Sequence, residues 1–357
     1  MRYAWLLAAG AILATQPVAW ATAGHDERVA DEPVWTERAR VDALRRAVVW
    51  RQPAVPIERA DLATTPDALP DELTCRFHVD ELSGLTPKFE CELRGGEVIK
   101  VKYAGAEPHG EVAASRLLRA LGFGADHVAF ARRVRCYGCP RFPFSTMKVV
   151  SLAGAERLFE RGLDYDTAID FEWPAVERKS KIESIETPEG RGWAFHELAR
   201  VPTASRTHRD AFTLMAVFLA HWDNKAENQR LQCLSGAPRR DGTCARPLAM
   251  LQDVGGTFGP RKVELDAWRA APIWEDRARC RVTMASLPHG GATFTAVEIS
   301  EAGRQFLATR LRKLRDVQIE ALFRGARFEH HDGTVAGWVA AFKQRVAAIA
   351  DGPRCPK

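Results

Sequence analysis

The sequence predicts an α+β protein with two lobes, because strand-like patterns come first along the chain and helix-like patterns follow. Between residues 74 and 103, apolar and polar side chains alternate, which is typical of strands that bury one face. Beyond residue 209, apolar side chains recur at three- and four-residue intervals, which is typical of helices. We therefore expect a small antiparallel sheet with one helix, then a mostly helical lobe, with a polar segment at 221–228 where the two patterns meet.

The first 23 residues have the pattern of a secretory signal peptide. Arg2 precedes an apolar stretch at 4–14, and the small residues at 19–23 offer a cleavage site of the A-x-A type. An apolar stretch of about 11 residues is too short to span a bilayer, and we find no other segment suited to it. We expect a signal peptide at 1–23 and an extracytoplasmic mature chain, periplasmic or secreted, without a transmembrane segment.

Residues 24–70 are charged and interrupted by prolines. We expect an N-terminal extension that packs loosely or is partly disordered, with one amphipathic helix near 36–49. The compact part is expected to begin at residue 71 with strands joined by a Gly95-Gly96 turn. The expected strands are 74–80, 88–93 and 97–103.

A helix is expected to begin at Glu111 and to end near Gly122. One more strand, at 145–152, closes a first lobe at 71–152, and the second lobe spans 153–357. The second lobe is expected to begin with a helical stretch at 153–170 and an irregular stretch at 171–200. Its later helices are expected at 209–220, at 300–322 with Ser300 as N-cap, and at 334–350.

The eight cysteines are an even number, which favours disulfides in an exported chain. A turn-rich insert lies between Cys233 and Cys244, and a disulfide there would staple an extended hairpin. Cys136 and Cys139 have the C-x-x-C spacing of a redox pair or of half a zinc site. We favour a structural disulfide in a tight turn for these two.

The charge pattern argues against nucleic acid as a partner. The 357 residues are 46% hydrophobic and 27% charged, an ordinary globular composition, and the formal net charge is +5. Basic residues are scattered rather than gathered in one block, so we expect no nucleic-acid binding. We also expect a monomeric protein.

The polar segment reads His221-Trp-Asp223-Asn-Lys225-Ala-Glu-Asn228, and Asp253-Val-Gly follows it. The spacing H-x-D-x-K-x-x-N followed by D-x-G suits phosphoryl transfer. That reaction needs a carboxylate that orients the acceptor, a cation beside the moving phosphoryl group and two oxygen ligands for metal ions. One short loop and one turn can supply all four groups.

On these motifs the sequence resembles the protein-kinase-like superfamily, in particular its atypical branch of secretory-pathway kinases and phosphatidylinositol kinases. The resemblance implies a two-lobed kinase-like fold. It implies that Asp223 orients the acceptor hydroxyl and that Lys225 neutralises charge on the transferring group. It also implies that Asn228 and Asp253 hold Mg²⁺ or Mn²⁺, and that His221 supports the loop by hydrogen bonding.

The resemblance also implies a nucleotide-binding set in the first lobe. Lys102 matches the strand lysine that grips the α- and β-phosphates of ATP, with Lys100 as a competitor on the same strand face, and Glu111 matches its helical partner. Gly84 and Lys88 stand where a phosphate-covering loop is expected. The loop lacks the usual G-x-G-x-x-G, and a plain hairpin turn is an equal alternative.

We therefore expect an exported, ATP- and metal-dependent phosphotransferase that moves the γ-phosphoryl group to a hydroxyl on a protein, glycan or lipid. Two alternatives stay open. The same residues would transfer AMP if ATP bound in a flipped orientation. A kinase-derived binding module without catalysis is the other, because a periplasm holds little ATP. The missing Gly-rich loop and the faint A-P-E echo at Ala271-Pro272-Ile273-Trp274-Glu275 weaken the case for ordinary protein-kinase activity.

Overall fold

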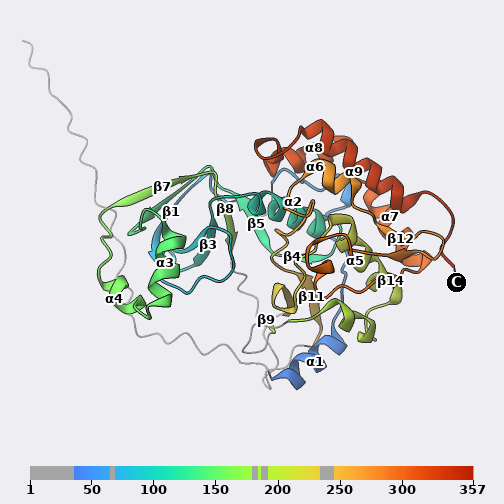
Figure 1. Cartoon of the computed structure of the whole chain (residues 1–357), viewed down its shortest axis with the longest axis horizontal. Coiled ribbons are helices and arrows are strands. Elements are labelled where there is room, and N and C mark those ends of the chain that lie inside the picture. The colour runs from blue at the N-terminus through green and yellow to red at the C-terminus, as the bar shows by residue number, and fades with distance from the viewer. Residues whose placement is uncertain (1–35, 65–68, 179–183, 186–191, 234–244, 357) are drawn as a thin grey trace, which may run out of the picture. The chain divides into compact units, whose positions relative to one another are not determined.

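A computed structural model of the chain describes residues 36–64, 69–178, 184–185, 192–233 and 245–356 (Figure 1). These residues all lie within one compact unit, Asp31–Lys357. The protein is α+β, with one large mixed sheet, two smaller sheets and a group of helices that carries the C-terminal half.

The largest sheet has seven strands in the order β5-β8-β3-β2-β1-β6-β7. Strand β1 pairs with β6 in parallel, and every other neighbouring pair is antiparallel, so the sheet is mixed rather than purely antiparallel as predicted. Its strands are β1 (Glu72–His78), β2 (Lys88–Leu93), β3 (Val98–Lys102), β5 (His127–Phe130), β6 (Arg133–Tyr137), β7 (Ala168–Glu172) and β8 (Ala175–Arg178).

The three strands predicted between residues 74 and 103 are confirmed as β1, β2 and β3. Their alternation has the expected physical cause: Phe77, Phe89 and Val101 are buried in a hydrophobic cluster that belongs to this sheet. The turn between β2 and β3 uses Gly96, whose φ of 78° lies in the region that glycine adopts without steric cost.

The strand predicted at 145–152 is wrong, because this segment is helix α3 (Pro143–Leu152). Proline at the first helical turn begins the helix, and the amide of Thr146 donates to the carbonyl of Phe142 at 2.9 Å. A short apolar run does not distinguish strand from helix by itself. The helix predicted at 153–170 is shorter than expected: α4 spans Glu156–Arg161, and β7 follows it.

Helix α2 (Glu107–Ala120) begins four residues before the predicted start at Glu111. It leads into β4 (Gly124–Ala125), the edge of a four-stranded sheet of order β4-β11-β10-β9. The other strands are β9 (Ser184–Ile185), β10 (Gln229–Cys233) and β11 (Pro247–Leu251). The stretch predicted as irregular, 171–200, contains strand β8 and the 3-10 helix η2 (Phe195–Arg200).

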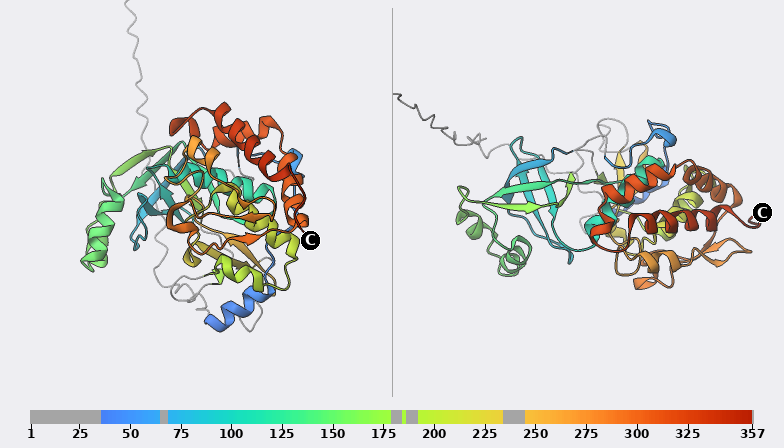
Figure 2. Two further views of the ribbon diagram at one scale, coloured as in Figure 1. Left: turned by 45° about the vertical axis from the view of Figure 1, so that its right-hand side comes forward. Right: turned by 90° about the horizontal axis from the view of Figure 1, so that it is seen from above.

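The C-terminal half is built on helices that pack on one another (Figure 2). The single helix predicted at 300–322 is two helices, because Arg315 adopts an extended backbone and its N–H donates to the side chain of Gln318 at 3.0 Å. Ser300 is the N-cap, as predicted. The helices are α5 (Arg206–Leu219), α6 (Leu265–Ala270), α7 (Glu301–Arg312), α8 (Asp316–Gly325) and α9 (Val335–Ala350).

Three short strands complete this half: β12 (Trp274–Asp276), β13 (Arg281–Val282) and β14 (Val297–Glu298). Single 3-10 turns are η1 (Ile57–Arg59), η3 (Ala226–Asn228), η4 (Pro288–Gly291) and η5 (Phe328–His330). Within the described part of the chain, no helix has both the length and the apolar character needed to cross a membrane.

The N-terminal segment does not pack loosely where the structure describes it. Helix α1 (Glu37–Arg46) contributes Ala43 and Leu44 to the main hydrophobic core, and Ile57 follows them into it. Arg40 is fully buried, and its guanidinium donates to the carboxylate of Glu197 at 2.8 Å. The expectation of a loose extension is therefore wrong for these residues, because their apolar side chains complete the core.

Three disulfides lie within the described residues: Cys75–Cys91, Cys136–Cys139 and Cys280–Cys355. The predicted structural disulfide at Cys136–Cys139 is confirmed. The sulfurs of Cys75, Cys91 and Cys136 lie within 4.8 Å of one another, but each already belongs to a disulfide, so this group does not offer thiolates to zinc. The predicted Cys233–Cys244 bond falls partly outside the described residues.

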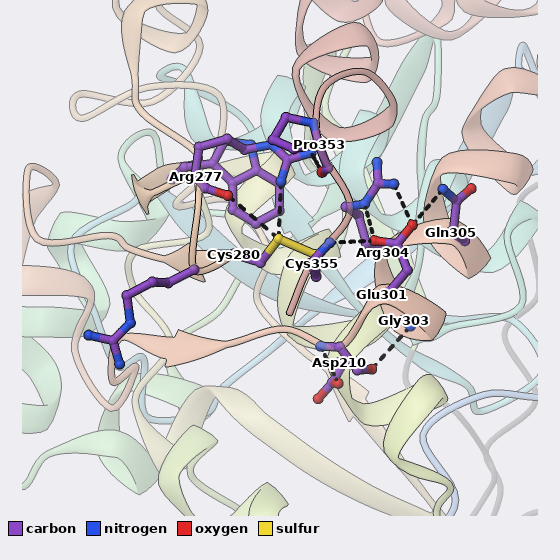
Figure 3. Close-up of a disulfide and its surroundings, with 12 residues drawn as sticks. Asp210, Arg277, Cys280, Glu301, Gly303, Arg304, Gln305, Pro353 and Cys355 are labelled. Carbon is purple, nitrogen blue, oxygen red and sulfur yellow. Dashed lines mark hydrogen bonds and ion pairs between the residues drawn. A yellow bond between two sulfur atoms is a disulfide. The ribbon is translucent and has the colours of Figure 1, made fainter. Parts of the chain in front are cut away.

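The Cys280–Cys355 bond fastens the end of the chain beside α7 (Figure 3). The backbone N–H of Cys355 donates to Oε2 of Glu301 at 2.9 Å, and Arg304 pairs with the same carboxylate at 2.7 Å. Arg277 donates to the carbonyl of Pro353 at 2.8 Å. The C-terminal tail is thus held by one covalent bond and by several hydrogen bonds.

Candidate active site

Lys102 lies at the centre of a buried group of charged side chains. Its Nζ lies 2.7 Å from both carboxylate oxygens of Glu111 and 3.2 Å from Oδ1 of Asp253. Lys102 ends strand β3, Glu111 lies in the second turn of α2, and Asp253 follows strand β11. The fold therefore brings together two residues, Lys102 and Asp253, that are 151 positions apart in the chain.

Lys100, the competitor on the same strand, has a different partner. Its Nζ lies 3.1 Å from both carboxylate oxygens of Glu177 on β8. Side chains two residues apart on a strand point the same way, so Glu177 also approaches Lys102, at 3.8 Å. Of the two lysines, Lys102 is the one that contacts both Glu111 and Asp253.

The contact between Lys102 and Glu111 favours the charged form of both groups. It raises the pKa of Lys102 well above its usual value in spite of burial, with Asp253 and Glu111 as the largest contributors. For Glu111 the effects oppose one another: burial raises its pKa above the ordinary value, whereas Lys102 lowers it. The 2.7 Å contacts to both oxygens describe an ion pair between the ammonium of Lys102 and the carboxylate of Glu111.

Asp253 is held in an unusual backbone conformation. Its φ of 48° lies in the left-handed region, which non-glycine residues seldom adopt. Its N–H donates to Oδ2 of Asp126 at 3.4 Å. The pairing of β4 with β11 brings Asp126 to this place. Burial would raise the pKa of Asp253, but Lys102, Lys100 and Lys88 outweigh it and keep the pKa well below its ordinary value.

His221 anchors the loop that precedes the candidate catalytic residue. Its ring is fully buried, and Nε2 lies 3.2 Å from the side-chain amide of Gln229. The side chain of Asn224 donates to the carbonyl of His221 at 2.7 Å. Burial lowers the pKa of His221 to about 4, so the ring is neutral at pH 7. Ala220, in a left-handed conformation, turns the chain out of α5 into this loop.

The loop and the D-x-G turn are joined through their backbones. Trp222 donates its N–H to the carbonyl of Gly256 at 3.1 Å, and Gln252 donates to the carbonyl of Asn228 at 3.1 Å. Asn228 closes the loop on itself, since its Nδ2 donates to the backbone carbonyl of Asp223 at 2.8 Å. Backbone hydrogen bonds therefore hold the loop with Asp223 and Asn228 beside the turn that carries Asp253.

The carboxylate of Asp223 is partly exposed, with 27% of its side chain accessible to solvent, and it lies 3.5 Å from Nζ of Lys225. Lys225 is more exposed, at 55%. Both side chains are thus accessible to a molecule from solvent, in contrast to the buried Lys102 and Glu111. Such exposure suits groups that would act on an incoming acceptor.

Glycines allow the D-x-G turn to approach its neighbours closely. A Cβ at Gly255 would overlap the side chain of Glu107, and a Cβ at Gly256 would lie 2.8 Å from Cβ of Asp223. On the helix side, a Cβ at Gly110 would lie 3.2 Å from the carbonyl oxygen of Gly255. Larger residues at these positions would separate α2, the turn and the loop.

Glu107 connects three segments of the site. Its carboxylate accepts a hydrogen bond from the hydroxyl of Thr86, in the turn between β1 and β2, and pairs with Lys262 beyond the D-x-G turn. Gly84 lies in the turn between β1 and β2, as Thr86 does, and its φ is 72°. A Cβ at Gly84 would lie 3.3 Å from Nζ of Lys88. Lys88 is buried, which lowers its pKa together with the nearby charge of Lys102.

Comparisons with protein-family models, curated proteins and solved structures found no match. What this site can do therefore follows from its own geometry. Lys102 and Lys88 provide buried positive charge of the kind that binds phosphate. Asn228 and the ionised Asp253 carry the oxygen ligands that Mg²⁺ and Mn²⁺ prefer.

Three carboxylates of this cluster are absent from the sequence-based prediction. Glu107 lies one helical turn before Glu111 and therefore on the same face of α2, which is a signal that the spacing carries. Glu177 and Asp126 reach the site only because β8 pairs with β3 and β4 pairs with β11. Their local sequences carry no comparable signal.

Proposed function

We propose that this protein is an exported, ATP- and metal-dependent phosphotransferase with a two-lobed, kinase-like fold. The observation that carries the proposal is the contact of Lys102 with both Glu111 and Asp253. A lysine fixed by a helical glutamate, beside an ionised aspartate, is the arrangement that grips nucleotide phosphates and their metal ion in phosphotransferases.

In this proposal each group has one task. Lys102 binds the α- and β-phosphates of ATP, and Glu111 fixes the direction in which Lys102 points. Asn228 and Asp253 would hold Mg²⁺ or Mn²⁺, which neutralises phosphate charge when it is bound. Asp223 accepts a hydrogen bond from the acceptor hydroxyl and orients it toward the γ-phosphate. Lys225, beside Asp223, offsets negative charge that develops on the transferring group.

Gly84 and Lys88 replace the phosphate-covering Gly-rich loop in this proposal. Gly84 leaves room for the ammonium of Lys88, which faces Lys102 across the strand pair β2–β3. The buried charge of Lys88 would contact phosphate oxygens where a Gly-rich loop uses backbone N–H groups.

The proposed location outside the cytoplasm rests on the disulfides, because stable disulfides form in oxidising compartments. The proposed acceptor is a hydroxyl on a protein, glycan or lipid. The exposure of Asp223 and Lys225 favours an acceptor that approaches from solvent.

The test is incubation of the purified chain with γ-labelled ATP, Mg²⁺ or Mn²⁺, and a panel of protein, glycan and lipid acceptors. We expect label transfer to fall at least about 100-fold in Asp223→Asn, because acid–base groups contribute factors of this size. The matched control is Asp266→Asn, which changes an aspartate whose side chain is 90% exposed. Equal transfer by wild type and Asp223→Asn would contradict the proposal.

Mass spectrometry of the product separates phosphoryl transfer from transfer of AMP by the mass of the adduct. Thermal unfolding with ATP and each metal separates catalysis from binding alone. A rise in Tm that depends on Asp253 but comes with no product would indicate a nucleotide-binding module without catalysis.

A further inference from the structure

A cavity lies behind helix α2, away from the Lys102 centre. Its volume is about 610 Å³, within the range of small-molecule sites. Arg116 and Ala120 line it and lie about 140° and 180° around the helix from Glu111, at about 100° per residue. The cavity and the Lys102 centre therefore lie on opposite faces of one helix.

The wall of this cavity is unusually basic. Four arginines line it, against a single aspartate: Arg51, Arg59, Arg116, Arg119 and Asp61. The aspartate is already engaged, because its carboxylate accepts hydrogen bonds from the N–H groups of Ala63 and Thr64 and from the Thr64 hydroxyl. Even with Arg119 left aside, three arginines stand against one aspartate, so the described lining has an excess of positive charge.

Two of the arginines lack a close ion pair among the described residues, although the charge of Arg59 also interacts with that of Glu58. The side chains of Arg51 and Arg59 are exposed and form no ion pair or hydrogen bond among the described residues. Arg116 is the opposite case, since only 7% of it is exposed. Its Nη1 donates to the carbonyl of Ala63 at 2.6 Å, whereas its Nε is buried and has no hydrogen-bond partner in the described part of the chain.

Burying a guanidinium is costly, and burial lowers the pKa of Arg116 to about 10, although the nearby charge of Asp61 partly opposes this. An anion in the cavity would offset this cost and would also attract the two exposed arginines at its rim. Guanidinium groups bind phosphate and carboxylate oxygens in pairs. The basic part of the wall thus favours an anionic head group.

Apolar side chains that are at least partly exposed line another part of the wall: Pro53, Val55 and Ala120. An inorganic ion would leave this surface uncovered, whereas an organic body would bury it. We infer that the cavity behind α2 binds a small organic anion, with a phosphate or carboxylate head beside the arginines and an apolar body against Val55 and Ala120. This site is independent of the proposed function.

Isothermal titration calorimetry of the full chain tests the site with four probes: hexyl phosphate, hexanoate, inorganic phosphate and hexanol. We expect hexyl phosphate or hexanoate to bind with one-to-one stoichiometry, and the tighter of the two identifies the head group. Inorganic phosphate and hexanol should each bind at least tenfold more weakly, because each supplies only half of the interaction.

The decisive variant is Arg51→Gln/Arg59→Gln, which removes two exposed charges and leaves the core intact. We expect at least tenfold weaker binding of the preferred probe. The matched control, Arg38→Gln/Arg354→Gln, removes two exposed arginines elsewhere and should bind like wild type. A second variant, Ala120→Phe, fills the cavity and should also weaken binding.

Three results would overturn the inference: no probe binds, hexanol binds as well as the anions, or both double variants lose affinity equally. None of these measurements uses ATP, so failure here is distinguishable from failure of the proposed phosphotransferase activity.

Discussion

Gly255 and Glu107 are packed so closely that a Cβ at Gly255 would overlap the Glu107 side chain. This contact joins the D-x-G turn to the first turn of α2. It also fixes the carboxylate that pairs with Lys262 and accepts from Thr86.

We predict that Gly255→Ala destabilises the protein by about 1–3 kcal/mol, the usual cost of overpacking a tight site. Urea unfolding at pH 7 measures the change. The control is Gly95→Ala in the β2–β3 turn, where a Cβ would meet nothing within 4 Å. If both variants unfold at the same urea concentration, the packing of Gly255 does not constrain the turn.

The ion pair of Lys102 and Glu111 predicts strong coupling between two substitutions. Lys102→Met leaves Glu111 buried without its cation, which typically costs about 3–5 kcal/mol. The double variant Lys102→Met/Glu111→Met removes both charges, and we expect it to be more stable than Lys102→Met alone. A double-mutant cycle by chemical unfolding measures this coupling.

Lys100→Met provides the comparison for Lys102→Met. Lys100 pairs with Glu177 and is 23% exposed, so its replacement should cost less than the replacement of the buried Lys102. Under the proposed function, Lys100→Met should also keep the stabilisation by ATP that Lys102→Met loses. Loss in both variants would assign the phosphate contact to the pair rather than to Lys102.

His221 predicts a loss of stability in acid. The pKa of the native ring is about 4, whereas an unfolded histidine takes up its proton near pH 6.5. Between these values the unfolded state binds more protons, so the free energy of unfolding falls as the pH falls from 6.5 to 4. The full effect is roughly 3 kcal/mol.

The measurement is the pH dependence of urea unfolding for wild type and for His221→Asn. The variant is expected to start less stable and to show a smaller decline between pH 6.5 and pH 4. His330→Asn, at an exposed position, should retain the wild-type slope. A wild-type slope in His221→Asn would mean that another group causes the decline.

We predict that the stability lost on removing a disulfide increases with the length of the loop that the disulfide closes. Cys280–Cys355 spans 75 residues and Cys75–Cys91 spans 16. Chain-entropy estimates give about 4.5 and about 3 kcal/mol for loops of these lengths. Paired Cys→Ser variants measured by thermal unfolding should therefore lose more stability at the C-terminal bond. The reverse order would indicate that local packing outweighs loop closure.

The elements that the sequence predicts well are those with long periodic patterns or clear caps. Helix α9 follows Thr334 as predicted, and Ser300 caps α7, because each side chain accepts a hydrogen bond from the third residue beyond it. The secondary structure of residues 145–152 is harder to predict from the sequence, since a short apolar run with Val149 and Val150 suits both strand and helix. Pro143 and the sheet beside the run decide for helix.

The residues of the candidate site also differ in whether a local sequence pattern predicts them. Lys102 and Glu111 are predictable because they lie close together in the chain, on a strand and the next helix. Their contact with Asp253, and the approach of Glu177 and Asp126, depends on strand pairings between distant segments. Such pairings are a property of the whole fold and leave no local pattern. The burial of Ala43, Leu44 and Ile57 is likewise visible only once the core is assembled.

The carboxylates around Lys102 affect how a nucleotide would bind. Four of them lie within 4 Å of its Nζ: Glu107 at 3.7 Å, Glu111 at 2.7 Å, Glu177 at 3.8 Å and Asp253 at 3.2 Å. Lys100 and Lys262 pair with two of these carboxylates, and Lys88 lies beside Lys102. The four carboxylates and the four lysines therefore offset one another and leave no net positive charge for a triphosphate. Under the proposed function, the metal ion would supply the positive charge that bare ATP lacks here, so affinity for ATP would fall sharply in a chelator.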